Sequence, residues 1–83
     1  MKYLFLSLLL LAGAIAPASS QPLFTTQQQA QQHCPSDTIV WLNIPTGIYH
    51  IRGMRWYGAT KRGAYVCQKE ADKAGDRETR NGQ

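Results

Sequence analysis

The chain has 83 residues, with nine lysines or arginines against five acids, so its formal net charge is +4 at pH 7. A sequence of this length accommodates one small domain. The two cysteines, two histidines and five acids form no constellation that dictates a catalytic chemistry.

The amino-terminal segment has the three features of an export signal. Lys2 supplies a positive charge, an apolar stretch follows between Tyr3 and Ala12, and small residues extend to Ser20. A secretory signal needs these features in this order. The apolar stretch is shorter than the ~20 residues that a membrane-spanning helix requires. We therefore expect a cleaved signal, no permanent membrane span, and a mature protein in the periplasm or the medium.

Two cleavage positions satisfy the requirement for small residues at −3 and −1. Cleavage after Ala18 makes residues 1–18 the signal peptide, and cleavage after Ser20 is the alternative. Only about one-third of the residues that follow Ala18 are apolar. A core of this size rarely supplies more than ~3 to 5 kcal/mol. A covalent cross-link is therefore expected to contribute to stability.

Cys34 and Cys67 would meet an oxidising compartment after export, where two thiols in a small domain favour a disulfide. Closing this loop contributes about 3.7 kcal/mol, so reduction is expected largely to unfold the protein. The alternative is a metal site that adds His33 and His50, since thiolate and imidazole are ligands that Zn²⁺ prefers. Structural zinc motifs place ligands in pairs two to four residues apart, and the adjacent His33-Cys34 does not fit. We expect the disulfide, with no metal and no cofactor.

The first element after the signal is a short polar helix. Thr25 or Thr26 is placed to cap a helix over residues 27–33, with a glutamine of the first turn bonding back to the cap. This helix carries five glutamines and no apolar stripe, so we expect it to be solvated and held mainly at Cys34. Helix and lead-in together form the region 19–33.

Two strands in a hairpin follow. Residues 38–42 are β-branched and aromatic between turn residues, which predicts the central strand. After a loop with Pro and Gly, residues 48–51 are expected to return as the second strand. Alternation along this strand would place Tyr49 and Ile51 on one face, and Ile48 and His50 on the other.

The remaining elements are short. Residues 52–63 are basic and punctuated by glycine, which is typical of an ordered loop. A short strand is expected over residues 64–66, and a helix over residues 68–74 that ends at Gly75.

Together these elements predict an α+β fold. A small antiparallel hairpin or three-stranded sheet would pack with a short N-terminal helix and a C-terminal helix, cross-linked by one disulfide. The single domain is expected to span residues 34–76. Residues 77–83 are expected to be a polar tail.

Several blocks of the sequence are distinctive in combination: Val40-Trp41, Tyr49-His50, Trp56-Tyr57-Gly58-Ala59-Thr60-Lys61, Glu70-Ala71 and Ala74-Gly75-Asp76-Arg77. Over residues 33–83 the chain resembles a family of short exported bacterial proteins to which no catalysis is assigned. It is also distantly similar to the small module appended to some secreted nucleases and to the zinc-binding module of Ada-type DNA repair proteins. The resemblance implies a hairpin packed with a helix. The zinc-binding relatives have four cysteines and this chain has two, so zinc does not carry over.

His50 is the one candidate catalytic residue that the local pattern and the resemblance both single out. An imidazole beside a carboxylate can act as a general base near neutral pH. The sequence locates no nucleophile, carboxylate or metal for it. We therefore expect a structural His50 at a strand end and no enzymatic activity. The alternative is a hydrolase or nuclease-associated accessory that uses His50 with a metal.

The better functional lead is a segment in which cationic and aromatic residues alternate. Cations bind phosphate or carboxylate, and exposed rings stack on bases or sugars; the same residues also occur as ordinary core anchors and solvated charges. The segment predicts a non-enzymatic binding or structural module whose partner is an anionic envelope component, a nucleic acid or an acidic protein. An inhibitor of another exported protein is a third hypothesis. The candidate binding residues are Arg52, Arg55, Trp56, Tyr57, Lys61, Arg62 and Tyr65.

Overall fold

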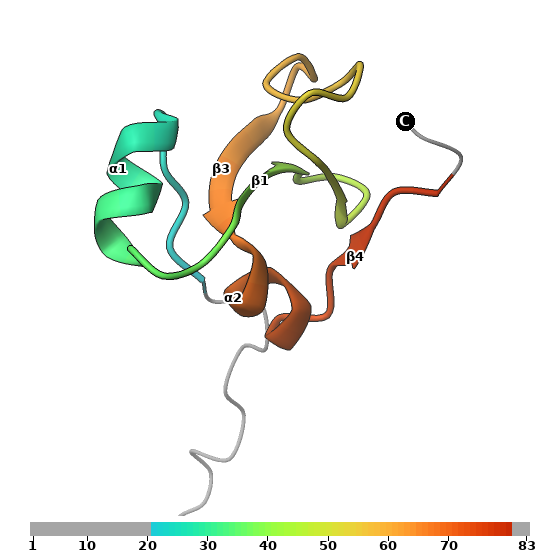
Figure 1. Ribbon diagram of the computed structural model, residues 1–83. Helices are drawn as coiled ribbons and strands as arrows, with labels where there is room; N and C mark the ends of the chain where they lie inside the picture. Colours follow the sequence, from blue (N-terminus) through green and yellow to red (C-terminus); the bar gives the residue numbers. More distant parts are fainter. Residues whose placement is uncertain (1–20, 81–83) are drawn as a thin grey trace, which may run out of the picture.

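The computed structural model describes residues 21–80, which form two helices and a four-stranded mixed sheet (Figure 1). In chain order the elements are α1 (Gln27–His33), β1 (Ile39–Asn43), β2 (Ile48–His50), β3 (Gly63–Cys67), α2 (Gln68–Lys73) and β4 (Arg77–Glu78). The predicted α+β class is confirmed. The predicted signal peptide, residues 1–18, lies outside the described residues. Within residues 21–80, no helix has the length and apolarity needed to cross a membrane.

β1 occupies the interior of the sheet, whose strand order is β3-β1-β2-β4. It pairs antiparallel with both β2 and β3, so Trp41 lies opposite His50 on one side and Tyr65 on the other. The Ile-Val-Trp-Leu sequence suits this place because β-branched and aromatic side chains pack well on a pleated surface, and all four are buried. The prediction of a central strand at 38–42 is confirmed with a shift of one residue.

The two helices pack on opposite faces of the sheet. Ala30 of α1 belongs to a buried cluster with Ile39, whereas Ala71 of α2 belongs to a cluster with Val40. Adjacent residues of a strand point to opposite faces, so Ile39 and Val40 mark the two sides. By the same alternation Trp41 lies on the face that α1 covers in part. His50, its register partner, shares that face.

Helix α1 begins where the sequence predicts. The Thr26 hydroxyl accepts a hydrogen bond from the Gln29 backbone N–H (3.1 Å), which caps the helix. The predicted return bond, from a glutamine side chain to the backbone of the cap residue, is replaced by a side-chain bond. In it the Thr25 hydroxyl donates to Gln29 Oε1 (3.1 Å). The lead-in also holds the helix, because Phe24 forms an antiparallel bridge with Tyr65 of β3. The disulfide is therefore one of at least two attachments of α1 to β3.

Helix α2 starts directly after β3 and takes its cap from another segment. Its N-cap residue, Cys67, makes no side-chain cap bond. Instead the Asp37 carboxylate accepts from the Lys69 backbone N–H (2.9 Å). At the other end Gly75 has φ of 95°, and its N–H donates to the Asp72 carbonyl (3.1 Å). The predicted end of the helix at Gly75 is confirmed.

The sheet has one strand more than the predicted hairpin or three-stranded sheet, because Arg77 and Glu78, in the predicted polar tail, form β4. These residues pair parallel to β2, and the Arg77 N–H donates to the Gly47 carbonyl (2.9 Å). The Thr79 N–H donates to the Tyr49 carbonyl (2.9 Å). Both β4 side chains are exposed, so backbone pairing alone forms this strand. Residues 81–83 of the predicted tail lie outside the described residues.

Candidate anion-binding groove

An open groove with a volume of about 530 Å³ lies on the α1 side of the sheet, between the β1–β2 hairpin and the loop that precedes β3. Its walls join where the Ile44 N–H donates to the Arg62 carbonyl (3.0 Å). A volume of this size falls in the range of small-ligand sites. The lining residues are Asn43, Pro45, Thr46, Ile48, His50, Trp56, Ala59, Thr60, Lys61 and Arg62.

The loop wall of the groove is fixed to the sheet through Trp41. The Trp41 indole N–H donates to Thr60 Oγ1 (2.8 Å), which holds the loop over β1. Gly63 lies flat against the same indole, and a Cβ at Gly63 would overlap the ring. Within the loop, successive turns close through backbone bonds such as Ala59 N–H to the Trp56 carbonyl (3.0 Å). The sequence-based expectation of an ordered loop fits these contacts.

The groove is cationic and partly apolar. Lys61 and Arg62 line it and are exposed, and none of its lining residues is an acid. Trp56 is 37 % exposed, which leaves ring surface open to a ligand. The Arg55 guanidinium lies over the Trp56 ring, 5.1 Å from its centroid, so it adds positive charge beside the groove through a cation–π contact. Such a lining attracts anions that also present a flat or apolar face.

Two of the predicted binding residues, Tyr57 and Tyr65, make packing contacts and do not line the groove. Tyr65 packs edge-on against Trp41, with ring centroids 4.8 Å apart, and against Tyr57 at 5.6 Å. The Tyr57 hydroxyl donates to Gln27 Oε1 (2.6 Å), and burial raises the pKa of this phenol. These rings therefore fasten the loop to α1 and β3 rather than line the groove.

The seven predicted binding residues thus separate into three groups. Trp56, Lys61 and Arg62 line the groove. Arg52 and Arg55 are exposed on the same loop and do not line it. The tyrosines form the packing described above.

His50 is brought into the groove wall. It is 6 % exposed and stands at the end of β2, opposite Trp41. Ile48 and His50 lie on one face of β2, as predicted, because both line the groove. Tyr49 lies on the other face, in the core, with Ile51 packed against it. The residues that line the groove together with His50 include no acid.

Sequence reasoning missed the polar residues of the hairpin and the loop. The Asn43 side-chain amide donates to Thr46 Oγ1 (3.0 Å), which shapes the turn at the mouth of the groove. Gly47, with φ of 70°, completes that turn. The Asn-Ile-Pro-Thr-Gly sequence indicates a turn, but nothing in it indicates that the turn faces Thr60 across a cavity.

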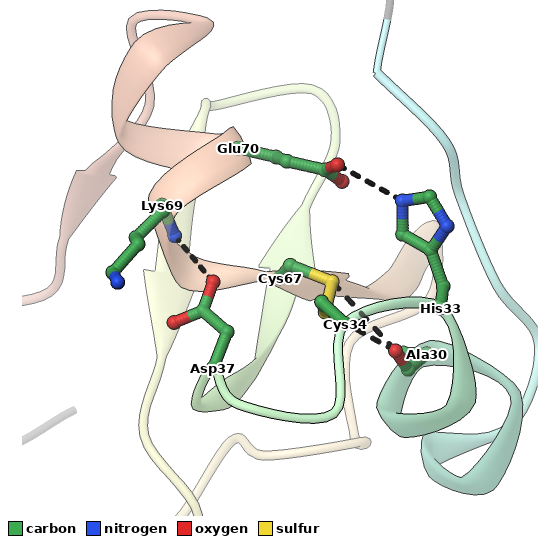
Figure 2. A network of polar contacts seen from close by, with 7 residues as sticks. All are labelled: Ala30, His33, Cys34, Asp37, Cys67, Lys69 and Glu70. Carbon is green, nitrogen blue, oxygen red and sulfur yellow. Dashed lines mark hydrogen bonds and ion pairs between the residues drawn. A yellow bond between two sulfur atoms is a disulfide. The ribbon is translucent and has the colours of Figure 1, made fainter.

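A second polar network surrounds the disulfide, at the junction of α1 and α2 (Figure 2). Cys34 and Cys67 form the predicted disulfide, with Cα atoms 6.5 Å apart, and both sulfurs contact the Ala30 carbonyl oxygen. His33 Nε2 lies 2.9 Å from Glu70 Oε2. Among the described residues the potential metal ligands gathered here include His33 but not His50. The alternative site built on both histidines therefore does not form.

No family model matches the chain, and the searches of curated proteins and of solved structures return no match.

Proposed function

We propose that this protein is an exported, non-enzymatic module that binds an anionic component of the cell envelope. The observation that carries the proposal is the groove between the hairpin and the basic loop, which combines an open Trp56 ring with Lys61 and Arg62 and has no acidic lining. Positively charged side chains bind carboxylate and phosphate, and the ring adds apolar contact.

The shape of the groove favours a small anionic unit, such as an acidic sugar or a phosphorylated group at a chain end. A concave site of about 530 Å³ suits a ligand of this size better than a flat protein surface. The Thr60 oxygen already accepts from Trp41, which leaves its O–H free to donate to a ligand oxygen. Hydroxyl-rich acidic glycans supply the anions and the acceptors that this lining requires.

Export is the second part of the proposal and rests on the sequence of residues 1–20, which lie outside the described residues. A disulfide between Cys34 and Cys67 supports it, because structural disulfides persist in oxidising compartments. The resemblance to short exported bacterial proteins points to the same compartment.

The proposal is tested by ¹⁵N NMR titration of the purified protein. The probes are an acidic oligosaccharide of galacturonate units, a short inorganic polyphosphate and, as the control, an uncharged galactose oligosaccharide. We expect one or both charged probes to shift the indole N–H of Trp56 and the amides of Lys61 and Arg62, with no effect of the neutral control. Shifts confined to α2, or no shifts with either charged probe, would contradict the proposal.

A second candidate function follows from the place of His50 in the groove wall. In this version the protein is a hydrolase or nuclease accessory in which His50 acts as a base beside a metal-bound phosphate or ester. Turnover of a bis-aryl phosphodiester tests it. Activity that is lost with a chelator and in His50→Ala would favour this candidate over the binding module.

A further inference from the structure

The network around the disulfide gathers side chains that favour a transition metal in two overlapping groups, one of His33, Cys67 and Glu70 and one of Cys34, Cys67 and Asp37. Ligand atoms of His33, Cys67 and Glu70 all lie within 4.8 Å of one another, and Cys34 is bonded to Cys67. They come from the end of α1, the end of β3 and the first turn of α2, as Figure 2 shows. This cluster surrounds the disulfide, and none of its residues lines the groove.

Glu70 has an oxygen with no protein partner in this cluster. Its Oε2 lies beside His33 (2.9 Å), whereas its Oε1 is buried and has no hydrogen-bond partner within the described part of the chain. A buried carboxylate oxygen without a donor is costly unless a proton or a cation compensates it. The site therefore has a buried acceptor oxygen that no described donor satisfies.

The neighbouring acid, Asp37, is occupied by hydrogen bonds to the backbone. Asp37 Oδ1 accepts from the Thr38 N–H (2.7 Å), and Oδ2 accepts from the Lys69 N–H (2.9 Å). Both oxygens thus already accept a backbone hydrogen bond, and the one to Lys69 caps α2. Glu70 is the carboxylate of this cluster that remains available to a metal.

We propose that the reduced form of this protein binds one Zn²⁺ ion through Cys34, Cys67, His33 and Glu70. Two thiolates, an imidazole and a carboxylate form a tetrahedral donor set that suits zinc. The oxidised form does not bind zinc in this way, because the disulfide sulfurs carry no thiolate charge. Metal and disulfide are alternative cross-links between the same two segments.

The chemistry balances with a dithiol reductant. The reductant transfers two electrons and two protons to the Cys34–Cys67 bond and itself becomes a disulfide, which yields two protein thiols. Zn²⁺ then displaces the two thiol protons and binds the thiolates. A zinc-bound chain would keep the ends of α1 and β3 together before oxidation, or after a reductant has opened the disulfide.

The purified protein tests this directly. It is reduced with a phosphine, which does not itself supply thiol ligands, and titrated with Zn²⁺ against a chromophoric chelator. We expect one Zn²⁺ per reduced chain, none bound with comparable affinity by the oxidised chain, and a higher melting temperature of the reduced chain with zinc than without. Co²⁺ in place of Zn²⁺ should give thiolate-to-metal absorption typical of a tetrahedral site.

Variants separate this site from non-specific capture by an unfolded chain. His33→Ala and Glu70→Gln should each weaken zinc binding by ~10-fold or more. The oxidised protein should stay folded, because the contact between these two side chains is more than one-third exposed and contributes little stability. The matched control, His50→Ala, should bind zinc as tightly as the wild type. Equal loss in both histidine variants, no loss in His33→Ala, or no zinc bound by the reduced chain would overturn the proposal.

Discussion

Opening the Cys34–Cys67 bond should remove most of the stability of this protein. The bridge closes a loop across a sequence separation of 33 residues, which corresponds to about 3.7 kcal/mol in the chain-entropy description. A core of this size supplies only ~3 to 5 kcal/mol. For a domain of this length each kcal/mol shifts the melting temperature by roughly 4 to 8 °C, so reduction should lower it by about 15 to 30 °C.

The assay is thermal unfolding followed by circular dichroism, with and without a phosphine reductant. A chelator is present in both samples, so that no metal replaces the disulfide. The double variant Cys34→Ala/Cys67→Ala is a second measure of the same loss, and its melting should not respond to the reductant. A melting temperature of the wild type that reduction leaves unchanged would refute the reasoning.

Three further predictions follow from individual contacts. Gly63→Ala should destabilise the fold by about 1 to 3 kcal/mol or more and alter tryptophan fluorescence, because the new Cβ overlaps the Trp41 ring. The control is Gly53→Ala, whose Cβ contacts no other atom, so this variant should show only the cost of its positive φ. Asp37→Ala should lower the free energy of unfolding by about 1 kcal/mol through loss of the α2 cap, and an unchanged denaturation midpoint would refute that role. Burial and the hydrogen bond to Asp72 raise the pKa of Tyr49 above its ordinary value of 10.0. The stabilising contribution of Tyr49 is therefore complete below pH 10 and is lost as pH rises through the pKa of the folded state. In unfolding titrations, Tyr49→Phe should reduce this loss of stability at alkaline pH.

The elements with strong local signals were predictable from the sequence. The Thr26 cap, the β-branched run of β1 and the Gly75 stop are decided within a few residues, and the structure has each of them. The disulfide was predictable because two cysteines allow one pairing. Local chemistry therefore accounts for most of the fold class.

Features that depend on long-range contact were not predictable. β4 has no β-branched or aromatic residue and exists because its backbone meets the edge of β2. The groove likewise depends on Trp41, which appears in the sequence as a core residue and acts as the donor that places Thr60. Tyr57 and Tyr65 carry no sequence signal that separates packing from binding, so only their contacts assign them to packing.

The measurement that tests the central claim most directly compares two variants of equal net charge on a heparin column, which presents a sulfated, acidic glycan. Lys61→Ala/Arg62→Ala removes two cations from the groove, and Lys69→Ala/Lys73→Ala removes two from α2. The account predicts that the groove variant elutes at clearly lower salt than the wild type, with the slope of log affinity against log salt smaller by about 2, while the α2 variant stays close to the wild type. Equal losses in the two variants would show that net charge alone governs retention and would contradict an anion-binding groove.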